Sequence, residues 1–414
     1  MNLARKIGLM ALLALPLIYR QVGPVVADLR ETQEAFFGYG VICLSALFIG
    51  NIWLGAFLIL NMVLFIWNGQ QVGAVQVINI LLGCLLFAFS RVYFKKNKFS
   101  DLYPWILGIL AVNLVWMNLQ LHSIDPIFIG QTNDGVQQFR PFNDPVGFFG
   151  IKMANGIYIA SVIPILAVVN PILGVLLIIP LWLMRSSAVA LAVALSALLF
   201  TYYLYRRVFF GLLLALPVAC GLFIAYDLHD DSRTFTARFP VWHSAVRHLF
   251  GGGETLWGLI GYGPDSYRNY TPHKNFKFGG DEFYNHGIIH RQDNGFGFSY
   301  YSPQNDKAKI QELTKNIGNT QVAQGRLDEW DNPHSEPINV LFQTGLIGFA
   351  LIFCLIREMV LRFKYALKDK ELVTIASCLV VYFVTSLFHF PFEIARTAVF
   401  GMILMGAFYA KTDA

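Results

Sequence analysis

The stretch 337–356, PINVLFQTGLIGFALIFCLI, decides the fold class of this chain. It contains no charged side chain, and most of its residues are apolar. The hydrocarbon core of a bilayer is about 30 Å thick, and an α-helix needs roughly 20 apolar residues to cross it. Because a helix satisfies its backbone hydrogen bonds internally, such a stretch is stable within lipid. It therefore predicts a membrane-spanning helix.

Apolar stretches of similar length recur along the rest of the chain. Of its 414 residues, 56% are hydrophobic and 14% are charged, whereas soluble domains average roughly 45–50% and about 25%. The mean hydropathy of +0.52 over this length excludes a single soluble core, a disordered chain, a coiled coil and a small disulfide scaffold. We therefore predict an all-α polytopic membrane protein. Twelve spans are expected, near residues 5–21, 34–50, 52–68, 73–92, 102–119, 151–169, 171–185, 186–204, 208–226, 337–356, 372–390 and 394–411.

Two boundaries between neighbouring spans leave alternatives open. At Asn51 and at Asn170-Pro171 two apolar stretches follow each other with almost no connection. Each pair is either two helices or one long or re-entrant segment. The first span, with Arg5 and Lys6 before its apolar run, resembles a signal peptide but has no small-residue cleavage site, so we interpret it as retained.

Lysine and arginine are concentrated in the connections on one side of this arrangement. The positive-inside rule assigns such connections to the cytoplasm, and an even number of spans places both termini there. The expected organisation is nine spans in residues 1–226, a large loop on the opposite side in 227–336 and three spans in 337–414. The basic residues are Arg5 and Lys6, Arg91 with Lys95, Lys96 and Lys98, Arg206 and Arg207, those from Arg357 to Lys370, and Lys411.

The large loop differs in composition from the rest of the chain. It holds 25 of the 57 charged residues and is rich in Trp, Tyr, Phe and His, which argues against disorder. Residues 239–250 have helical spacing and are expected to lie at the membrane surface, with Trp242 and Phe250 in the headgroup region. Residues 305–316 form a second, more polar helix candidate.

The cysteines and the net charge give no sign of another kind of site. All five cysteines lie in apolar runs, which favours small core residues over disulfides or metal ligands. The histidines of the loop lack the spacing of a zinc site, so no metal is expected. A net charge of +5 is explained by basic cytoplasmic loops, and no nucleic-acid motif is present.

A histidine at the mouth of the 337–356 helix is the first candidate for chemistry. His334 precedes this helix directly and can exchange a proton near neutral pH; the alternative is a surface histidine that caps the helix. Glu336 either orients His334 or is an acidic residue stabilised by the dipole at the helix start.

Arginines near the ends of spans are the second group of candidates. Arg238 lies four residues before Trp242, and its guanidinium fits phosphate oxygens in pairs; the alternative is an interfacial arginine that pairs with a lipid headgroup or an acidic loop residue. Arg185 begins a span from the same side, where it either snorkels or has an anionic partner. Arg396, three residues after Glu393, has the spacing of a simple helical ion pair. Two arginines and a histidine without metal ligands suit a pyrophosphate leaving group and a hydroxyl nucleophile.

Two motifs of the chain resemble one known family. Residues 334–348, HSEPINVLFQTGLIG, are similar to the signature of the O-antigen ligase and polymerase superfamily, in which a histidine precedes a helix with a thr-gly-leu-ile-gly segment. Arg238 and Trp242, followed by GLIGYGP at 258–264, resemble the arginine-tryptophan helix and glycine-rich turn of that family. Twelve spans with one large outer loop agree with its topology. The resemblance covers most of residues 140–360.

The resemblance implies a class C-like glycosyltransferase on the periplasmic face of a Gram-negative inner membrane. The donor would be a glycan on undecaprenyl pyrophosphate, and the acceptor a hydroxyl of the lipid A core in a ligase. The alternatives are an O-antigen polymerase, a protein O-oligosaccharyltransferase and, outside the enzymes, a polysaccharide transporter.

The resemblance also implies roles for individual residues. His334 matches the family histidine that accepts the proton of the acceptor hydroxyl, and Arg238 matches the loop arginine that holds the pyrophosphate. Arg185 maps to a second arginine, although here the order is Arg-Ser-Ser where the family has a ser-arg pair. Gly261 and Gly263 belong to a turn that either lets backbone approach the substrate or is a plain tight turn.

Overall fold

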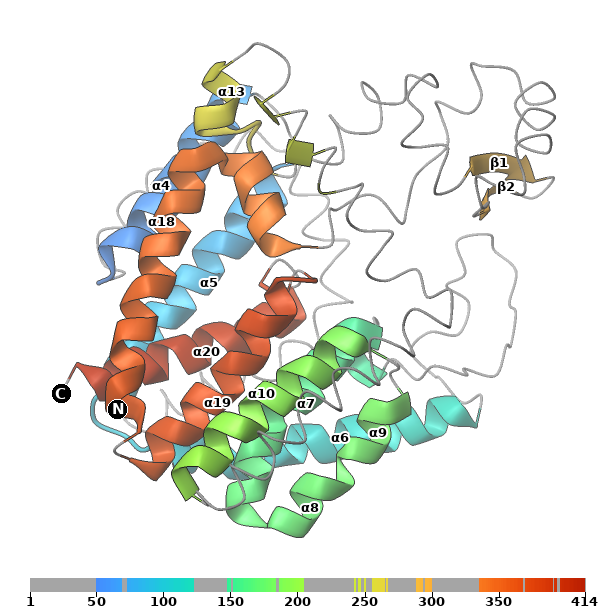
Figure 1. Ribbon diagram of the computed structural model, residues 1–414, viewed down its shortest axis with the longest axis vertical. Coiled ribbons are helices and arrows are strands. Elements are labelled where there is room, and N and C mark those ends of the chain that lie inside the picture. Colours follow the sequence, from blue (N-terminus) through green and yellow to red (C-terminus); the bar gives the residue numbers. More distant parts are fainter. Residues whose placement is uncertain are drawn as a thin grey trace.

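The computed structural model describes about half of the chain in detail and is helical apart from one hairpin (Figure 1). The description covers residues 50–68, 73–122, 147–149, 152–183, 186–204, 255–264, 288–292, 295–299, 335–367, 369–389, 391–392 and 395–413, with the single residues 242, 245, 246, 249, 250 and 266. The predicted spans near 5–21, 34–50 and 208–226 and the helix candidate at 305–316 lie outside these residues.

Several described helices have the length and composition of membrane spans. Three helical stretches are long and apolar enough to cross a bilayer, at Gln76–Phe94, Phe99–Leu121 and Glu336–Ala366. Shorter apolar helical stretches accompany them within the described residues, at Ile52–Phe65, Met153–Val169, Pro171–Leu181, Ala188–Tyr203 and Thr397–Thr412. The helical, membrane-protein character predicted from the sequence is confirmed at this level.

The helix bounds follow most of the predicted spans closely, but the helix that begins at Glu336 continues to Ala366, ten residues beyond the predicted end at 356. Asn51 and Asn170 each begin a new helix, because their side-chain oxygens accept hydrogen bonds from the first free backbone N–H groups. The described helices are α4 (Ile52–Asn68), α5 (Gly73–Phe94), η2 (Phe99–Leu102), α6 (Tyr103–Leu121), η3 (Gly147–Phe149), α7 (Lys152–Val169), α8 (Pro171–Leu176), α9 (Ile178–Leu183), α10 (Ser187–Leu204), α13 (Thr255–Ile260), α18 (Glu336–Ala366), α19 (Lys370–Ser386) and α20 (Ala395–Thr412).

Two predicted spans are corrected by interruptions. The span expected at 171–185 is divided into α8 and α9 at Leu177. Pro180 explains the break, because it has no N–H to donate to the carbonyl four residues earlier, at Leu176. The span expected at 337–356 is divided at Gly345, whose backbone angles (φ 61°, ψ −165°) are not helical. We call residues 336–344 and 346–366 the first and second arms of α18; they run in different directions from this bend (Figure 1).

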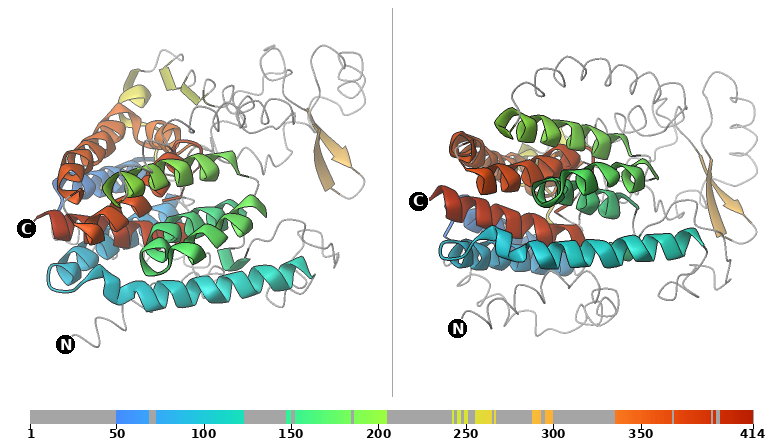
Figure 2. Two further views of the ribbon diagram at one scale, coloured as in Figure 1. Left: turned by 60° about the horizontal axis from the view of Figure 1, so that its bottom comes forward. Right: turned by 90° about the horizontal axis from the view of Figure 1, so that it is seen from below.

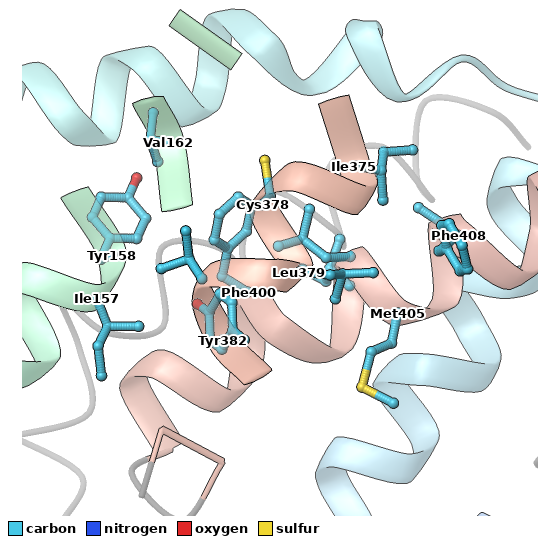
Figure 3. Close-up of a cluster of buried hydrophobic side chains, with 14 of the residues drawn as sticks. Ile157, Tyr158, Val162, Ile375, Cys378, Leu379, Tyr382, Phe400, Met405 and Phe408 are labelled. Carbon is cyan, nitrogen blue, oxygen red and sulfur yellow. The ribbon is translucent and has the colours of Figure 1, made fainter. Parts of the chain in front are cut away.

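A buried core joins helices from distant parts of the sequence. α20 packs against α5, and α19 packs against both α10 and α7. Figure 3 shows Tyr158 of α7, Tyr382 of α19 and Phe400 of α20 close together, with Cys378 and Leu379 beside them. The ring of Phe400 contacts both tyrosine rings, with centroids 5.8 and 6.4 Å apart. Cys84 and Cys378 are fully buried and free, as predicted for core cysteines.

One end of the helical body is held together by charged residues near the C-terminus. The carboxylate of Asp413 pairs with Arg91 of α5 at 2.6 Å and with Arg362 of α18 at 2.6 Å. Arg362 also pairs with Glu358 at 2.7 Å, and Glu358 accepts a hydrogen bond from Asn51. The end of α5, the end of α18 and the end of α20 therefore meet here. These are three of the basic segments that the sequence analysis placed on one side.

The hairpin is an addition to the predicted all-α fold. Its strands, β1 (Ile288–Gln292) and β2 (Gly295–Ser299), are antiparallel, and Gln292 pairs with Gly295 across a two-residue connection. Such a short connection is typical of β-hairpins. Figure 1 shows the hairpin to one side of the helices, and Figure 2 shows it beyond the outer end of α6.

Candidate functional site

The bend of α18 is bound by the glycine-rich turn that follows α13. The backbone N–H of Tyr262 donates to the carbonyl of Phe342 at 3.1 Å, and that of Gly263 donates to the carbonyl of Gln343 at 2.7 Å. These two carbonyls precede the bend, so they lack the partners that a continuous helix would supply. The turn at 261–263 therefore satisfies backbone groups that the bend leaves open.

Glycine is required on both sides of this contact. Gly261 has φ +76° and Gly345 has φ +61°, a region that other residues rarely adopt. A Cβ atom on Gly261 would lie 2.4 Å from the carbonyl carbon of Gln343, and one on Gly345 would lie 2.3 Å from that of Leu259. The two backbones thus touch directly. Gly263 has φ +96° and completes the turn.

An aromatic cluster joins a third segment to this contact. Tyr262 stacks on Trp257 with ring centroids 5.2 Å apart and lies 5.1 Å from the ring of Phe342. Ala245 and Leu249 are buried in the same cluster, and Trp242 packs against it. Residues 242, 245, 246, 249 and 250 are helical, in agreement with the helix predicted at 239–250.

The placement of that helix at the membrane surface stays a prediction, and the structure adds a protein contact for Trp242. Its ring packs against the same buried cluster as Ile338 and Leu341 of the first arm of α18. Of Trp242 and Phe250, the two side chains predicted to lie in the headgroup region, Phe250 is 49% exposed and is therefore available to lipid.

The start of α18 is anchored to the turn before α20. The backbone N–H of Glu336 donates to the carbonyl of His389 at 3.0 Å, and its carboxyl group accepts a hydrogen bond from the backbone N–H of Phe392. Ser335 and Glu336 are both buried. The residue after His334 is therefore fixed in position, and Glu336 holds the 389–392 turn.

A row of polar side chains follows the first arm of α18. Glu336, Asn339 and Gln343 are buried and occupy one face at spacings of three and four residues. Gln76 of α5 donates from its amide nitrogen to the side-chain oxygen of Gln343 at 2.8 Å. Buried polar residues within an apolar helix are costly and commonly mark functional sites. His389 adds a buried imidazole at the anchored end.

The predicted site residues divide into those that the structure describes and those that it does not. Glu336, Trp242, Gly261 and Gly263 all contact the first arm of α18 or its anchor. His334, Arg238, Arg185 and Glu393 lie outside the described residues, as does the side chain of Arg396. Their predicted roles remain untested. Within the described residues, no group of three His, Cys, Asp or Glu side chains could hold a metal ion.

Four residues of this region were not predicted from the sequence, namely Gln76, Asn339, Gln343 and His389. Asn339 and Gln343 carried a signal, because polar residues spaced four apart inside a predicted span indicate one polar helix face. Gln76 and His389 lie in other helices or turns, and their proximity depends on the tertiary packing.

Comparison with models of known protein families and with curated protein sequences finds no match for this chain.

Proposed function

We propose that this protein is a glycosyltransferase that moves a glycan from undecaprenyl pyrophosphate to a hydroxyl group of the lipid A core. The reaction would invert the anomeric centre and need no metal ion. In this proposal the protein is an O-antigen ligase of the bacterial inner membrane, with twelve spans, both termini in the cytoplasm and the site at the periplasmic face.

One observation carries most weight for this proposal. The chain resembles the O-antigen ligase superfamily through segments near Trp242, at 258–264 and at 335–348. These segments contact one another, although the third lies more than seventy residues after the other two. A chance likeness of short motifs would not predict such contacts. Their convergence on the first arm of α18 is what a shared site requires.

The chemistry follows from the residues that adjoin these fixed segments. His334 directly precedes the anchored Ser335 and accepts the proton of the acceptor hydroxyl as it attacks the anomeric carbon. Arg238, four residues before Trp242, and Arg185 pair with the pyrophosphate and stabilise the charge that develops as it leaves. The bond from the anomeric carbon to the pyrophosphate oxygen breaks while the bond to the acceptor oxygen forms.

Glu336 lies in the first turn of α18, where the helix dipole stabilises an acidic side chain. Its carboxyl group accepts a hydrogen bond from Phe392 N–H, so it holds the start of α18 against the turn before α20. In this proposal Glu336 is a positioning residue that fixes the chain on which His334 lies.

The orientation is supported by the charged cluster around Asp413. Arg91 and Arg362, which the positive-inside rule assigns to the cytoplasm, lie together at one end of the helical body. The proposal places the bend at Gly345 and its partners toward the opposite, periplasmic side.

The glycans of a deletion strain test the function. Lipid-linked polymer that accumulates beside an uncapped lipid A core supports a ligase, whereas a core that bears a single repeat indicates a polymerase. A matched assay uses purified protein in liposomes with a defined undecaprenyl-pyrophosphate donor and EDTA. A normal glycan profile in the deletion strain, together with no transfer in liposomes, would contradict a glycosyltransferase.

A further inference from the structure

A cavity of about 220 Å³ lies between the two arms of α18 and the helices α4, α5, α19 and α20. The first arm contributes Glu336, Val340 and Gln343 to its wall, and the second arm contributes residues from Phe349 to Ile356. The bend at Gly345 creates this space, because a continuous helix would leave no interval between the arms.

The cavity has a polar side and an apolar side. Glu336 and Gln343 of the first arm and Gln76 and Asn79 of α5 supply one carboxyl group and three amides. The second arm of α18, α4 and the middle of α20 supply mainly phenylalanine, leucine, isoleucine and methionine. An occupant must therefore combine a long apolar part with a polar group at one end.

The apolar side is continuous with exposed apolar side chains of the second arm of α18. Phe349, Phe353 and Ile356 line the cavity and are also 37%, 59% and 37% exposed. In a helix long enough to cross a bilayer, exposed residues of this kind face hydrocarbon. The cavity thus opens sideways to lipid chains.

We propose that this cavity binds one hydrocarbon chain of a bilayer phospholipid whose amine headgroup lies near Glu336. An ammonium group can form charge-assisted hydrogen bonds with the carboxylate of Glu336 while the amides of Gln76 and Gln343 face the glycerol and ester oxygens. A pyrophosphate headgroup would meet the same carboxylate with like charge, so the occupant differs from the proposed donor. This inference does not depend on the proposed transferase activity.

Gly83 provides a variant that fills the cavity with little strain. It lines the cavity on α5, and an added Cβ would have its nearest contacts with the flexible side chain of Met402, at 3.2 Å. Gly108 on α6 is a matched control, because an added Cβ there has no neighbour within 4 Å. Gly83→Leu should block the chain, whereas Gly108→Leu adds the same side chain to another helix without filling the cavity.

Native mass spectrometry of the full chain measures the retained lipid. The protein is reconstituted in vesicles of phosphatidylethanolamine and phosphatidylglycerol in equal amounts and released in mild detergent. Wild type and Gly108→Leu should each retain phosphatidylethanolamine, and Gly83→Leu should retain it roughly tenfold less, since losing a few buried methylene contacts weakens binding by such a factor. Equal retention by Gly83→Leu would overturn the proposed site.

Glu336→Gln tests the headgroup part of the proposal separately. Glutamine can still accept the hydrogen bond from Phe392 N–H, so the anchor of α18 is kept, but the charge is lost. This variant should retain lipid while the preference for phosphatidylethanolamine falls to near equality with phosphatidylglycerol. An unchanged preference, or a polyprenyl diphosphate as the retained species from native membranes, would refute the amine-headed occupant.

Photolabelling of the wild-type protein avoids any dependence on how the variants fold. A phosphatidylethanolamine with a photoreactive group in its chain should label peptides that contain residues 349–356 and 80–84. Ile172 and Ile179 of α8 and α9 are 71% and 62% exposed and serve as a surface reference. Labelling at that reference alone would show that lipid only surrounds the protein and would reject the cavity as a binding site.

Discussion

Gly261 and Gly345 face each other across a contact in which neither residue can carry a side chain. Each has a positive φ, and a Cβ on either one would collide with backbone atoms of the opposite segment at 2.3–2.4 Å. The bend in α18 and the turn after α13 therefore depend on each other, because each accommodates the backbone of the other.

Replacing either glycine with alanine should destabilise the protein. The positive φ alone costs roughly 1–2 kcal/mol for a residue with a Cβ, and the backbone collision adds to this cost. Thermal unfolding of the purified protein in detergent should show a lowered Tm for Gly261→Ala and Gly345→Ala. Gly108→Ala is the control, since its Cβ meets nothing within 4 Å and alanine favours the helix. If all three variants unfold at the wild-type temperature, the contact does not hold the bend.

The sequence predicted where most helices begin and end, for reasons that are local. Apolar stretches of span length are visible in the residues themselves, whereas the helix caps formed by Asn51 and Asn170 resolve boundaries that the sequence left open. The bend at Gly345 was not predicted, because a glycine within an apolar run is compatible with a straight helix. Its angles are set by the turn at 261–263, which lies more than eighty residues earlier in the chain.

The same distinction applies to the candidate site, where some features follow from short sequence motifs and others only from tertiary packing. The motifs at 258–264 and 334–348 were recognisable as short patterns, and Glu336 and Trp242 were singled out from them. The hydrogen bond between Gln76 and Gln343 and the position of His389 arise only from helix packing. Periodicity within one segment contains no information about which distant segment lies beside it.

From the ion pairs of Asp413 we expect the protein to lose stability at acid pH. Partial burial raises the pKa of its carboxyl group, but the hydrogen bonds from Arg362 and Arg91 lower it more strongly, so the net pKa is below the ordinary value. A carboxylate with a lowered folded pKa contributes stability above its unfolded pKa, about 3.9, and loses it as the pH falls through the folded value. The Tm should therefore decrease further below pH 4 in wild type than in a variant without this group.

Asp413→Asn provides that comparison. It should have a Tm a few degrees lower than wild type at pH 7 and a smaller additional decrease from pH 5 to pH 3. High salt should narrow the difference at pH 7, because the ion pairs are partly exposed. Parallel pH profiles for the two proteins would exclude Asp413 as the source of the acid sensitivity.

His334 is expected to be essential for transfer and dispensable for folding. It lies two residues before Glu336, whose backbone N–H and carboxyl group hold the start of α18 against the turn at 389–392. His334→Ala should abolish transfer in liposomes, since no other group takes the proton of the acceptor hydroxyl, while Tm stays near that of wild type. Near-normal transfer by the purified variant would remove His334 from the mechanism. A large loss of Tm would instead assign it a structural role.

Substitutions of Arg238 distinguish a phosphate clamp from an arginine that merely reaches the membrane interface. If its guanidinium holds the pyrophosphate through two parallel hydrogen bonds, lysine keeps the charge but loses the paired geometry. Arg238→Lys should then lose much of the activity and Arg238→Ala nearly all of it, because a donor aimed at developing charge typically contributes about 10²–10³-fold in rate. An arginine that snorkels behaves differently, since lysine reaches the interface equally well and the Arg238→Lys substitution should then be almost neutral.

The same pair of substitutions tests Arg185, and Arg396 is the comparison expected to tolerate both changes. Transfer from the defined donor in the presence of EDTA is the measurement. Full activity of Arg238→Lys, or strict dependence on added divalent ions, would contradict a metal-free arginine clamp.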